Sequence, residues 1–136
     1  MDVLVFVTEQ WLLVSILLGL IFFYVFTEKQ KGGKTISSHE LTRLVNDGEA
    51  VILDVRETKE FNAGHIVDAL NIPFNTMEKR IVELDKHEGK TIVVVDKMGQ
   101  HAGAVGKQLA QRGFSVNRLS GGMMDWQGQN LPVVKK

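Results

Sequence analysis

Residues 54–73 read Asp54-Val-Arg-Glu-Thr-Lys-Glu-Phe-Asn-Ala-Gly-His-Ile-Val-Asp-Ala-Leu-Asn-Ile-Pro73. The apolar run at 51–55 leads into this stretch and predicts a buried β-strand. A short helix is expected over 58–63, because Gly64 follows it where helices commonly end. Residues 69–72 predict a second short strand, which a proline ends. A strand, a helix and a second strand are therefore expected in close succession.

Polar side chains in this stretch are expected to gather beneath the carboxyl edge of the sheet. They are Asp54, Arg56, Glu60 and His65. An isolated buried charge is expensive, so we predict that these groups satisfy one another. On this interpretation His65 has a structural role rather than a catalytic one.

The rest of the chain continues the alternation of strands and helices. Ser37 and Glu40 form a capping box, and the helix that follows is expected to stop at Asn46-Asp47-Gly48. Further helices are expected over 77–84, 102–112 and 123–127, and further strands over 91–95 and 115–119. Short strands that alternate with helices predict an α/β fold, with a parallel sheet covered by helices on both faces.

Asp96 ends the most apolar of these strands and is followed by Lys97-Met98-Gly99-Gln100-His101, which opens a helix. A tight turn at a helix N-terminus gathers backbone N–H groups into a cradle for an anion. If Asp96 turns inward, it acts as the resident anion of this loop, and Lys97, Met98, Gln100 and His101 form a rim for a partner. The alternative is that Asp96 points to solvent. The sequence leaves both orientations open.

Two stretches resemble signatures of the rhodanese domain. Residues 54–73 look like D-V-R-x-x-x-E-F-x-x-G-H-I-x-G-A-x-N-I-P, and they depart at Asp68, where the family usually has glycine. Gly121-Gly122-Met-Met-Asp-Trp126, followed by Leu131-Pro132-Val133, is similar to the closing G-G-x-x-x-W and L-P-V. The resemblance covers residues 35–134 and implies the rhodanese fold. Trp126 is then expected to plug the core, with its indole N–H bonded.

The middle signature differs. Active rhodaneses read C-[RK]-x-G-x-[RK]-[ST] after the strand, and their cysteine becomes a persulfide. This chain reads Asp96-Lys97-Met98-Gly99-Gln100-His101-Ala102 and contains no cysteine at all. A thiolate can accept and donate sulfane sulfur, whereas a carboxylate has no sulfur atom for this step. The resemblance therefore implies the fold without a catalytic residue.

The N-terminus carries a second predicted unit. Residues 11–26 hold no charge, and a continuous helix over 3–26 would be about 36 Å long, enough for a hydrocarbon core of about 30 Å. A cleaved signal peptide would need a positive n-region and a small-residue cleavage site, which this segment lacks. We expect a transmembrane anchor at 1–27, a flexible linker at 28–34 and a rhodanese-like domain at 35–136.

The charges beside this segment predict its orientation. Asp2 and Glu9 precede or interrupt it, whereas Lys29, Lys31 and Lys34 follow it. The positive-inside rule then places the domain in the cytoplasm, with the N-terminus outside and the segment in the inner (plasma) membrane.

Other activities have little support in the sequence. The 16 basic residues balance the 16 acidic ones, so no nucleic-acid-binding surface is implied. The four histidines lack ligand spacing, so neither a metal nor a cofactor is expected. An aspartyl-phosphate site at Asp96 would need a second carboxylate beside it. Gly106 and Lys107 suggest a Walker phosphate-binding loop, but His101 stands at the position of its first glycine and no Ser or Thr follows the lysine.

Two hypotheses for function remain. The first is a noncatalytic rhodanese-like module that binds another protein at the cytoplasmic face of the membrane. Ser15 and Gly19 would permit close approach of a second membrane helix, although the segment also suits a plain lipid-facing anchor. The second hypothesis is a sulfurtransferase that works with a thiol supplied by a partner.

Overall fold

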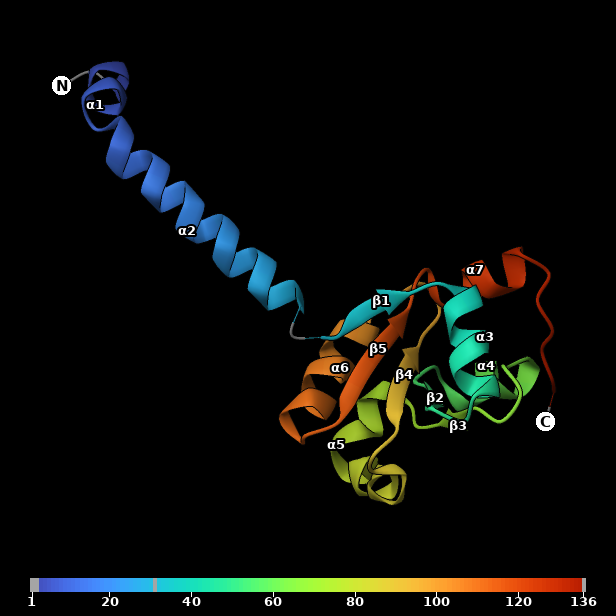
Figure 1. Cartoon of the computed structure of the whole chain (residues 1–136). Helices are drawn as coiled ribbons and strands as arrows, with labels where there is room; N and C mark the ends of the chain where they lie inside the picture. The colour runs from blue at the N-terminus through green and yellow to red at the C-terminus, as the bar shows by residue number, and fades with distance from the viewer. Residues whose placement is uncertain (1–2, 31, 136) are drawn as a thin grey trace. The chain divides into compact units, whose positions relative to one another are not determined.

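The computed structural model describes residues 3–30 and 32–135, without the side chains of 28–30. The chain divides into two compact units, residues 1–30 and residues 31–136 (Figure 1). The boundary between the units falls inside the predicted linker. Each unit is described by itself below.

The N-terminal unit is a broken helix, so the prediction of one continuous helix over 3–26 is wrong. Helix α1 (Val3–Glu9) and helix α2 (Trp11–Gln30) meet at an 85° bend. The bend falls at the polar triplet Thr8-Glu9-Gln10, where the Thr8 hydroxyl donates to the Val5 carbonyl at 2.9 Å. In residues 3–30 and 32–135 no single helix has the length and apolar character of a membrane span, but the bent pair meets both criteria together.

The C-terminal unit is built on a five-stranded parallel sheet with the order β1-β5-β4-β2-β3. The strands are β1 (Lys34–Ile36), β2 (Ala50–Asp54), β3 (Leu70–Asn71), β4 (Thr91–Val95) and β5 (Ser115–Leu119). The predicted parallel sheet is confirmed. Strand β1 was not predicted, because only one of its three residues is buried.

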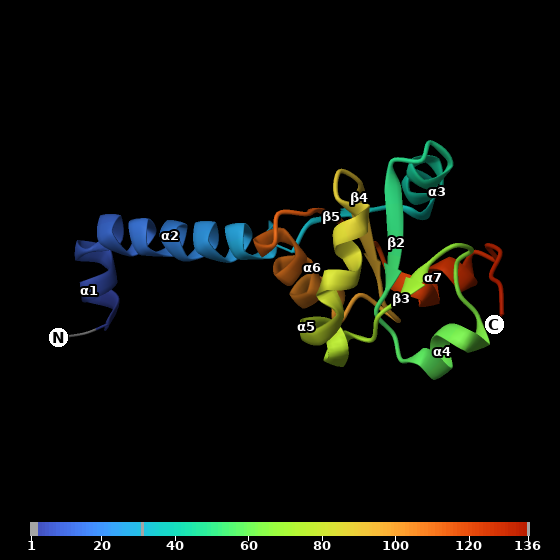
Figure 2. The same ribbon diagram turned by 90° about the horizontal axis from the view of Figure 1, so that it is seen from below.

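Alternate residues of the central strands enter two separate cores. Val93 and Val95 of β4 pack into one core with Trp126, whereas Ile92 and Val94 pack into the other with Leu109. Helices α3 (Ser38–Asn46) and α7 (Gly122–Gly128) cover the first face, and α5 (Met77–Arg80) and α6 (Ala102–Gln111) cover the second (Figure 2). Strands buried on both faces explain why their sequences are continuous apolar runs.

The remaining helices keep the predicted order, and one of them is shorter than predicted. Helix α3 is capped by the Ser37 hydroxyl, which accepts from the Glu40 N–H at 3.2 Å. Helix α4 spans Thr58–Ala63, and a short 3₁₀ turn, η1, spans Phe74–Thr76. The predicted helix over 77–84 is shorter than expected, since it tightens after Arg80 into the 3₁₀ segment η2 (Ile81–His87).

The second half of the predicted flexible linker is part of the folded domain. Gly32 lies against α6: a Cβ on Gly106 would collide with the Gly32 backbone, and a Cβ on Gly32 would collide with the Gly103 backbone. Gly33 takes a φ of +96° and lies against the Val116 carbonyl. These glycines allow main chain to pack on main chain, which any larger residue would prevent. At the other end of the predicted linker, α2 continues as far as Gln30.

Candidate functional site

The loop after β4 closes around the side chain of Asp96, which is only 2% exposed. Its Oδ1 accepts a hydrogen bond from the Gly99 N–H. Its Oδ2 accepts from the N–H groups of His101 at 2.6 Å and Ala102 at 3.1 Å. Of the two orientations that the sequence allows, the structure has the inward one.

Local backbone chemistry explains this arrangement. Gly99 has a φ of +96°, a conformation that L side chains rarely adopt, and it turns the chain back over the carboxylate. Helix α6 begins at Ala102, so the N–H groups there have no partner within the helix. A negative charge at such a position is favoured by about 0.3–1 kcal/mol when exposed and by up to about 2 kcal/mol when partly buried. The carboxylate therefore fills the anion cradle from within.

The start of α7 supports the loop from the other side. The Met123 N–H donates to the Asp96 carbonyl at 2.7 Å, and the Met124 N–H donates to the Lys97 carbonyl at 2.9 Å. A Cβ on Gly122 would collide with the Asp96 carbonyl oxygen. The glycine pair therefore does more than turn the chain, because Gly122 also permits this close approach.

The predicted rim residues surround the filled cradle. Lys97, Met98 and Gln100 are exposed, whereas the His101 ring stacks on Phe74 with centroids 3.9 Å apart and planes 7° apart. Phe74 was not predicted to be part of the site, because no sequence pattern links it to His101, 27 residues later. The sequence shows only that Phe74 directly follows the proline that ends the first signature.

Methionines extend this rim toward α7. An open hollow of about 450 Å³ is lined by Met98, Gly121, Met124, Asp125, Gly128 and Gln129. Met98 is 45% exposed and Met124 is 61% exposed. We call the set Phe74, Lys97, Met98, Gln100, His101 and Met124 the loop rim. It combines flexible thioethers with an aromatic stack.

Of the four polar residues predicted to satisfy one another, only Asp54 and Arg56 interact directly. Arg56 pairs with Asp54 at 2.7 Å in a buried ion pair, and its other contact is the Gly64 carbonyl at 2.8 Å. His65 instead donates from Nδ1 to the Phe61 carbonyl at 2.7 Å and stacks on the Phe61 ring. The prediction that all four groups satisfy one another is therefore wrong. Within the described residues Glu60 is partly exposed and has no hydrogen bond or ion pair, because one turn of α4 carries it away from the ion pair.

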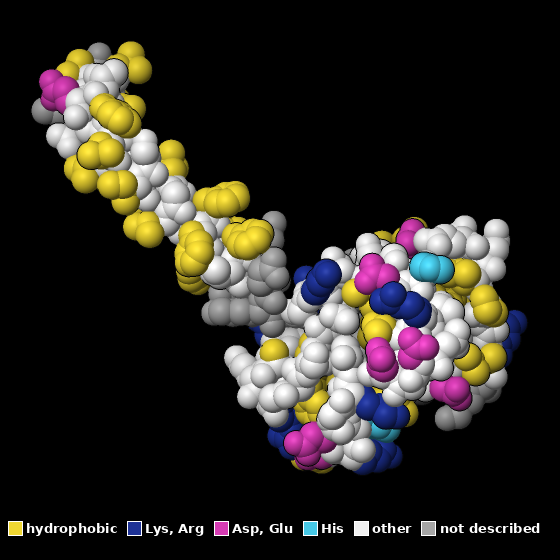
Figure 3. Space-filling model, in the orientation of Figure 1, with side chains coloured by type: hydrophobic (Ala, Val, Ile, Leu, Met, Phe, Trp, Pro, Cys, Tyr) yellow, Lys and Arg dark blue, Asp and Glu magenta, His cyan; other side chains and the backbone are white. Residues whose placement is uncertain are grey.

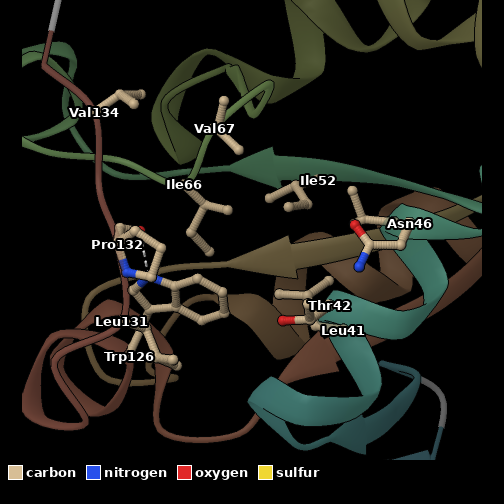
Figure 4. A pocket seen from close by; sticks show the side chains of 11 residues that line it. Leu41, Thr42, Asn46, Ile52, Ile66, Val67, Trp126, Leu131, Pro132 and Val134 are labelled. Atoms are coloured by element: carbon tan, nitrogen blue, oxygen red, sulfur yellow. Dashed lines mark hydrogen bonds between the residues drawn. The ribbon is translucent and has the colours of Figure 1, made fainter.

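Trp126 closes one core beneath an apolar groove, as Figure 4 shows. Its indole N–H donates to the Pro132 carbonyl at 3.0 Å, which confirms the predicted bond. The groove has a volume of about 220 Å³. It is lined by Leu41, Thr42, Val45, Asn46, Ile52, Ile66, Val67, Trp126, Leu131, Pro132 and Val134. This groove lies apart from the Asp96 loop and carries no ionisable side chain.

The chemistry open to the Asp96 loop is narrow. The three N–H groups are already bonded to the carboxylate, and a carboxylate cannot form a persulfide. Among the described side chains, no group of three His, Asp or Glu residues that could hold a metal ion is found.

Comparison with known proteins assigns the family. The model of the rhodanese-like domain matches residues 37–129. The chain belongs to the rhodanese-like domain family. The uncharacterised protein YibN of Escherichia coli K12 is 36% identical over 104 residues, which cover 75% of this chain and 73% of YibN. The putative sulfurtransferase YtwF of Bacillus subtilis is 33% identical over 100 residues, covering 73% of this chain and 95% of YtwF.

Solved structures agree with this assignment. A rhodanese-related protein from Thermoplasma volcanium superimposes with a TM-score of 0.69 at 26% identity, over 76% of this chain and 99% of that protein. The rhodanese-like domain here therefore has the family's sheet and helices, while Asp96 stands where the family resemblance implies a cysteine.

Proposed function

We propose that this chain is a catalytically inactive rhodanese-like module that binds a protein partner at the cytoplasmic face of the inner membrane. The N-terminal apolar unit serves as its single-pass anchor. The observation that carries the proposal is the filled cradle. Asp96 occupies the position of the reactive group and engages the three N–H groups that would otherwise hold an anion.

A binding role is supported by the character of the loop rim. Exposed methionine side chains are flexible and polarisable, and they are overused at protein-binding surfaces. The backbone beneath Met98 and Met124 is fixed by the hydrogen bonds between α7 and the loop. A rigid base that carries adaptable apolar side chains suits recognition of another protein.

The anchor is supported by composition and by flanking charge. Helices α1 and α2 hold exposed apolar side chains along their length, and in the described residues Glu9 is their only charge before residue 28. Lysines at 29, 31 and 34 follow. This bias favours an N-out, C-in orientation.

Site-specific photocrosslinking in cells tests the binding role. A photoreactive amino acid at Met98 or Met124 is expected to give a defined crosslinked band from native membranes. The matched control is Val82, which is 57% exposed on η2, away from the loop rim. A charge at the rim, Met98→Glu, is expected to abolish the band obtained from position 124. Equal crosslinking at positions 82, 98 and 124 would refute a partner at the rim.

Topology is tested separately. A reporter that works only outside the cytoplasm, fused after the last residue, is expected to stay inactive. An active reporter would show that the domain lies outside the cytoplasm, and the crosslinking result would still stand.

A further inference from the structure

The hollow beside the loop rim is lined by one charged side chain, Asp125, which lies in the first turn of α7. The exposed thioethers of Met98 and Met124 line the same hollow. A Cβ on Gly121 would collide with the Cβ of Asp125. The glycine at this position therefore allows the carboxylate to lie in the hollow between apolar side chains.

Two hydrogen bonds fix the carboxylate of Asp125. The amide of Gln129 donates from Nε2 to Asp125 Oδ2 at 2.9 Å. The Ser38 hydroxyl in turn donates to Gln129 Oε1 at 3.0 Å, which joins the start of α3 to the end of α7, two helices that lie side by side (Figure 1). Because the amide of Gln129 is bonded at both ends, it presents the carboxylate in one orientation.

The negative charge of Asp125 is not compensated. Asp54, Glu83 and Asp85 each pair with an arginine. By contrast, no Lys, Arg or His in the described part of the chain lies within ion-pair distance of Asp125. Residues 97–136 contain no other Asp or Glu, whereas acidic and basic side chains are interspersed on the face shown in Figure 3. Asp125 is therefore an isolated negative charge held in place beside the loop rim.

We propose that Asp125 receives an arginine side chain of the partner protein, and that Met98 and Met124 enclose the stem of that arginine. This inference rests on the proposed binding function of the loop rim. A guanidinium is planar and carries its N–H donors in a fixed fork, so it can bond to Oδ1 and to the remaining lone pair of Oδ2 together. Its methylene stem is apolar and lies favourably against flexible thioethers.

The size and charge of the hollow favour this occupant. A volume of about 450 Å³ accommodates one long side chain, whereas a helix with a diameter of about 10–12 Å would not enter it. An acidic side chain would be repelled by Asp125, and a wholly apolar one would bury the carboxylate without a partner, which is costly. Arginine is also enriched among the residues that contribute most to protein interfaces.

Methyl NMR of the full-length protein in phosphatidylcholine nanodiscs tests the proposal. The chain has five methionines, whose methyl groups can be labelled with carbon-13. The probe is a tripeptide with blocked ends, in which two leucines flank an arginine, and the matched peptide carries citrulline, the uncharged isostere. The arginine peptide is expected to shift the signals of Met98 and Met124 and to bind about tenfold more tightly than the citrulline peptide. Met77, which is buried in the other core, is the internal control.

A charge-neutralising variant completes this measurement. Asp125→Asn keeps an oxygen that can accept from Gln129 but removes the charge, so the affinity for the arginine peptide should fall about tenfold. Glu78→Gln removes an exposed negative charge from α5, on the other face of the sheet, and should leave the affinity unchanged. Equal binding of the two peptides, no shift from either, or an unchanged affinity in Asp125→Asn would overturn the inference.

Photocrosslinking in cells separates this result from the proposed function. Asp125→Asn is expected to weaken the crosslinked band from position 124 about tenfold. A band of full strength in this variant would show that a partner binds the loop rim without Asp125, so the binding function would stand and the inference would fall. If the wild type gives no band at all, the binding function is refuted, and this inference with it.

Discussion

The carboxylate of Asp96 gives three backbone N–H groups their acceptor, so its removal should weaken the loop. Asp96→Ala leaves these donors unsatisfied in a buried site. We expect a loss of about 1–3 kcal/mol in the free energy of unfolding. Sulfate should recover part of this loss by occupying the emptied cradle.

Chemical denaturation with and without sulfate measures both effects. Asp96→Asn is the matched control, because it keeps an acceptor oxygen and the volume while it removes the charge. It should fall between the wild type and the alanine variant. Equal stability and an equal sulfate response in all three proteins would contradict the role of Asp96 as a resident anion.

The ability to transfer sulfur also depends on single residues of the Asp96 loop. The wild type should transfer no sulfur from thiosulfate to cyanide above the uncatalysed rate, since no residue can hold a persulfide. Asp96→Cys alone should gain little. Adding His101→Arg and Ala102→Ser supplies a fixed cation and a hydroxyl, and an arginine at 101 can still stack on Phe74.

A cyanide-based colorimetric assay of the wild type and the two variants measures this rate. The combined variant should exceed Asp96→Cys clearly. Turnover by the wild type that scales with protein concentration and survives further purification would overturn the noncatalytic proposal.

At the scale of elements, Gly122 links α7 to the loop. Gly122→Ala should destabilise the domain by about 1–3 kcal/mol, because the added Cβ meets the Asp96 and Lys97 backbone and because φ is +61°. Gly128→Ala is the matched control on the same helix, where a Cβ has open space. It should be neutral or slightly stabilising. A similar loss from both changes would show that the close approach at Gly122 is not responsible.

His87 in the segment η2 is expected to make the free energy of unfolding depend on pH. Burial lowers the pKa of His87, with smaller contributions from the charges of Lys86 and Lys90, and its buried Nε2 has no hydrogen-bond partner in the described residues. The neutral ring is therefore favoured in the folded state. This contribution is complete above the unfolded pKa of about 6.5 and is lost as pH falls through the lower folded value.

Stability measured between about pH 7.5 and 5 tests this assignment. His87→Gln, which cannot gain a proton, should flatten the decline over that window. The substitution His39→Gln at an exposed position of α3 is the control. An unchanged slope in His87→Gln would assign the decline to other groups.

Elements with strong local signals were predictable from the sequence. The apolar runs predicted β2 and β4 to within a residue, and the capping box predicted the start of α3. Strand β1 was not predicted, because its three residues show no apolar pattern and it forms a strand only by pairing with β5. Asp68 has a φ of +65° at the position where the family usually has glycine, so the departure seen in the sequence marks a left-handed residue.

The site was only partly predictable, because its deciding contacts join distant segments. The residues of the loop were identified, but the orientation of Asp96 depends on how tightly the loop closes, which the pattern does not specify. The stack of His101 on Phe74 and the bonds from α7 each depend on the tertiary fold. The Glu60 error arose from treating nearness in sequence as nearness in space.

At the scale of the whole molecule, the packed glycines redefine where the domain starts. A chain that begins at residue 35 lacks Gly32, Gly33 and the first residue of β1, and it exposes the groove on α6 at Gly103 and Gly106. It should be less stable than a chain that begins at residue 31, by about 1–3 kcal/mol.

Urea unfolding of the two truncated chains, with a third that begins at residue 28, checks this prediction. The chains from 28 and 31 should unfold at the same midpoint, and the chain from 35 should unfold earlier. Three identical midpoints would mean that the packing of Gly32 contributes nothing to stability.

The filled cradle also removes thiol redox chemistry from the base of the loop. A cysteine in the same loop would change its charge and size whenever it was oxidised, alkylated or loaded with sulfur. Asp96 undergoes none of these reactions, so the base of the loop keeps one charge and one size. Oxidants would act on the loop rim instead, because the exposed thioethers of Met98 and Met124 can be converted to sulfoxides, and a partner at the rim would meet a more polar surface during oxidative stress.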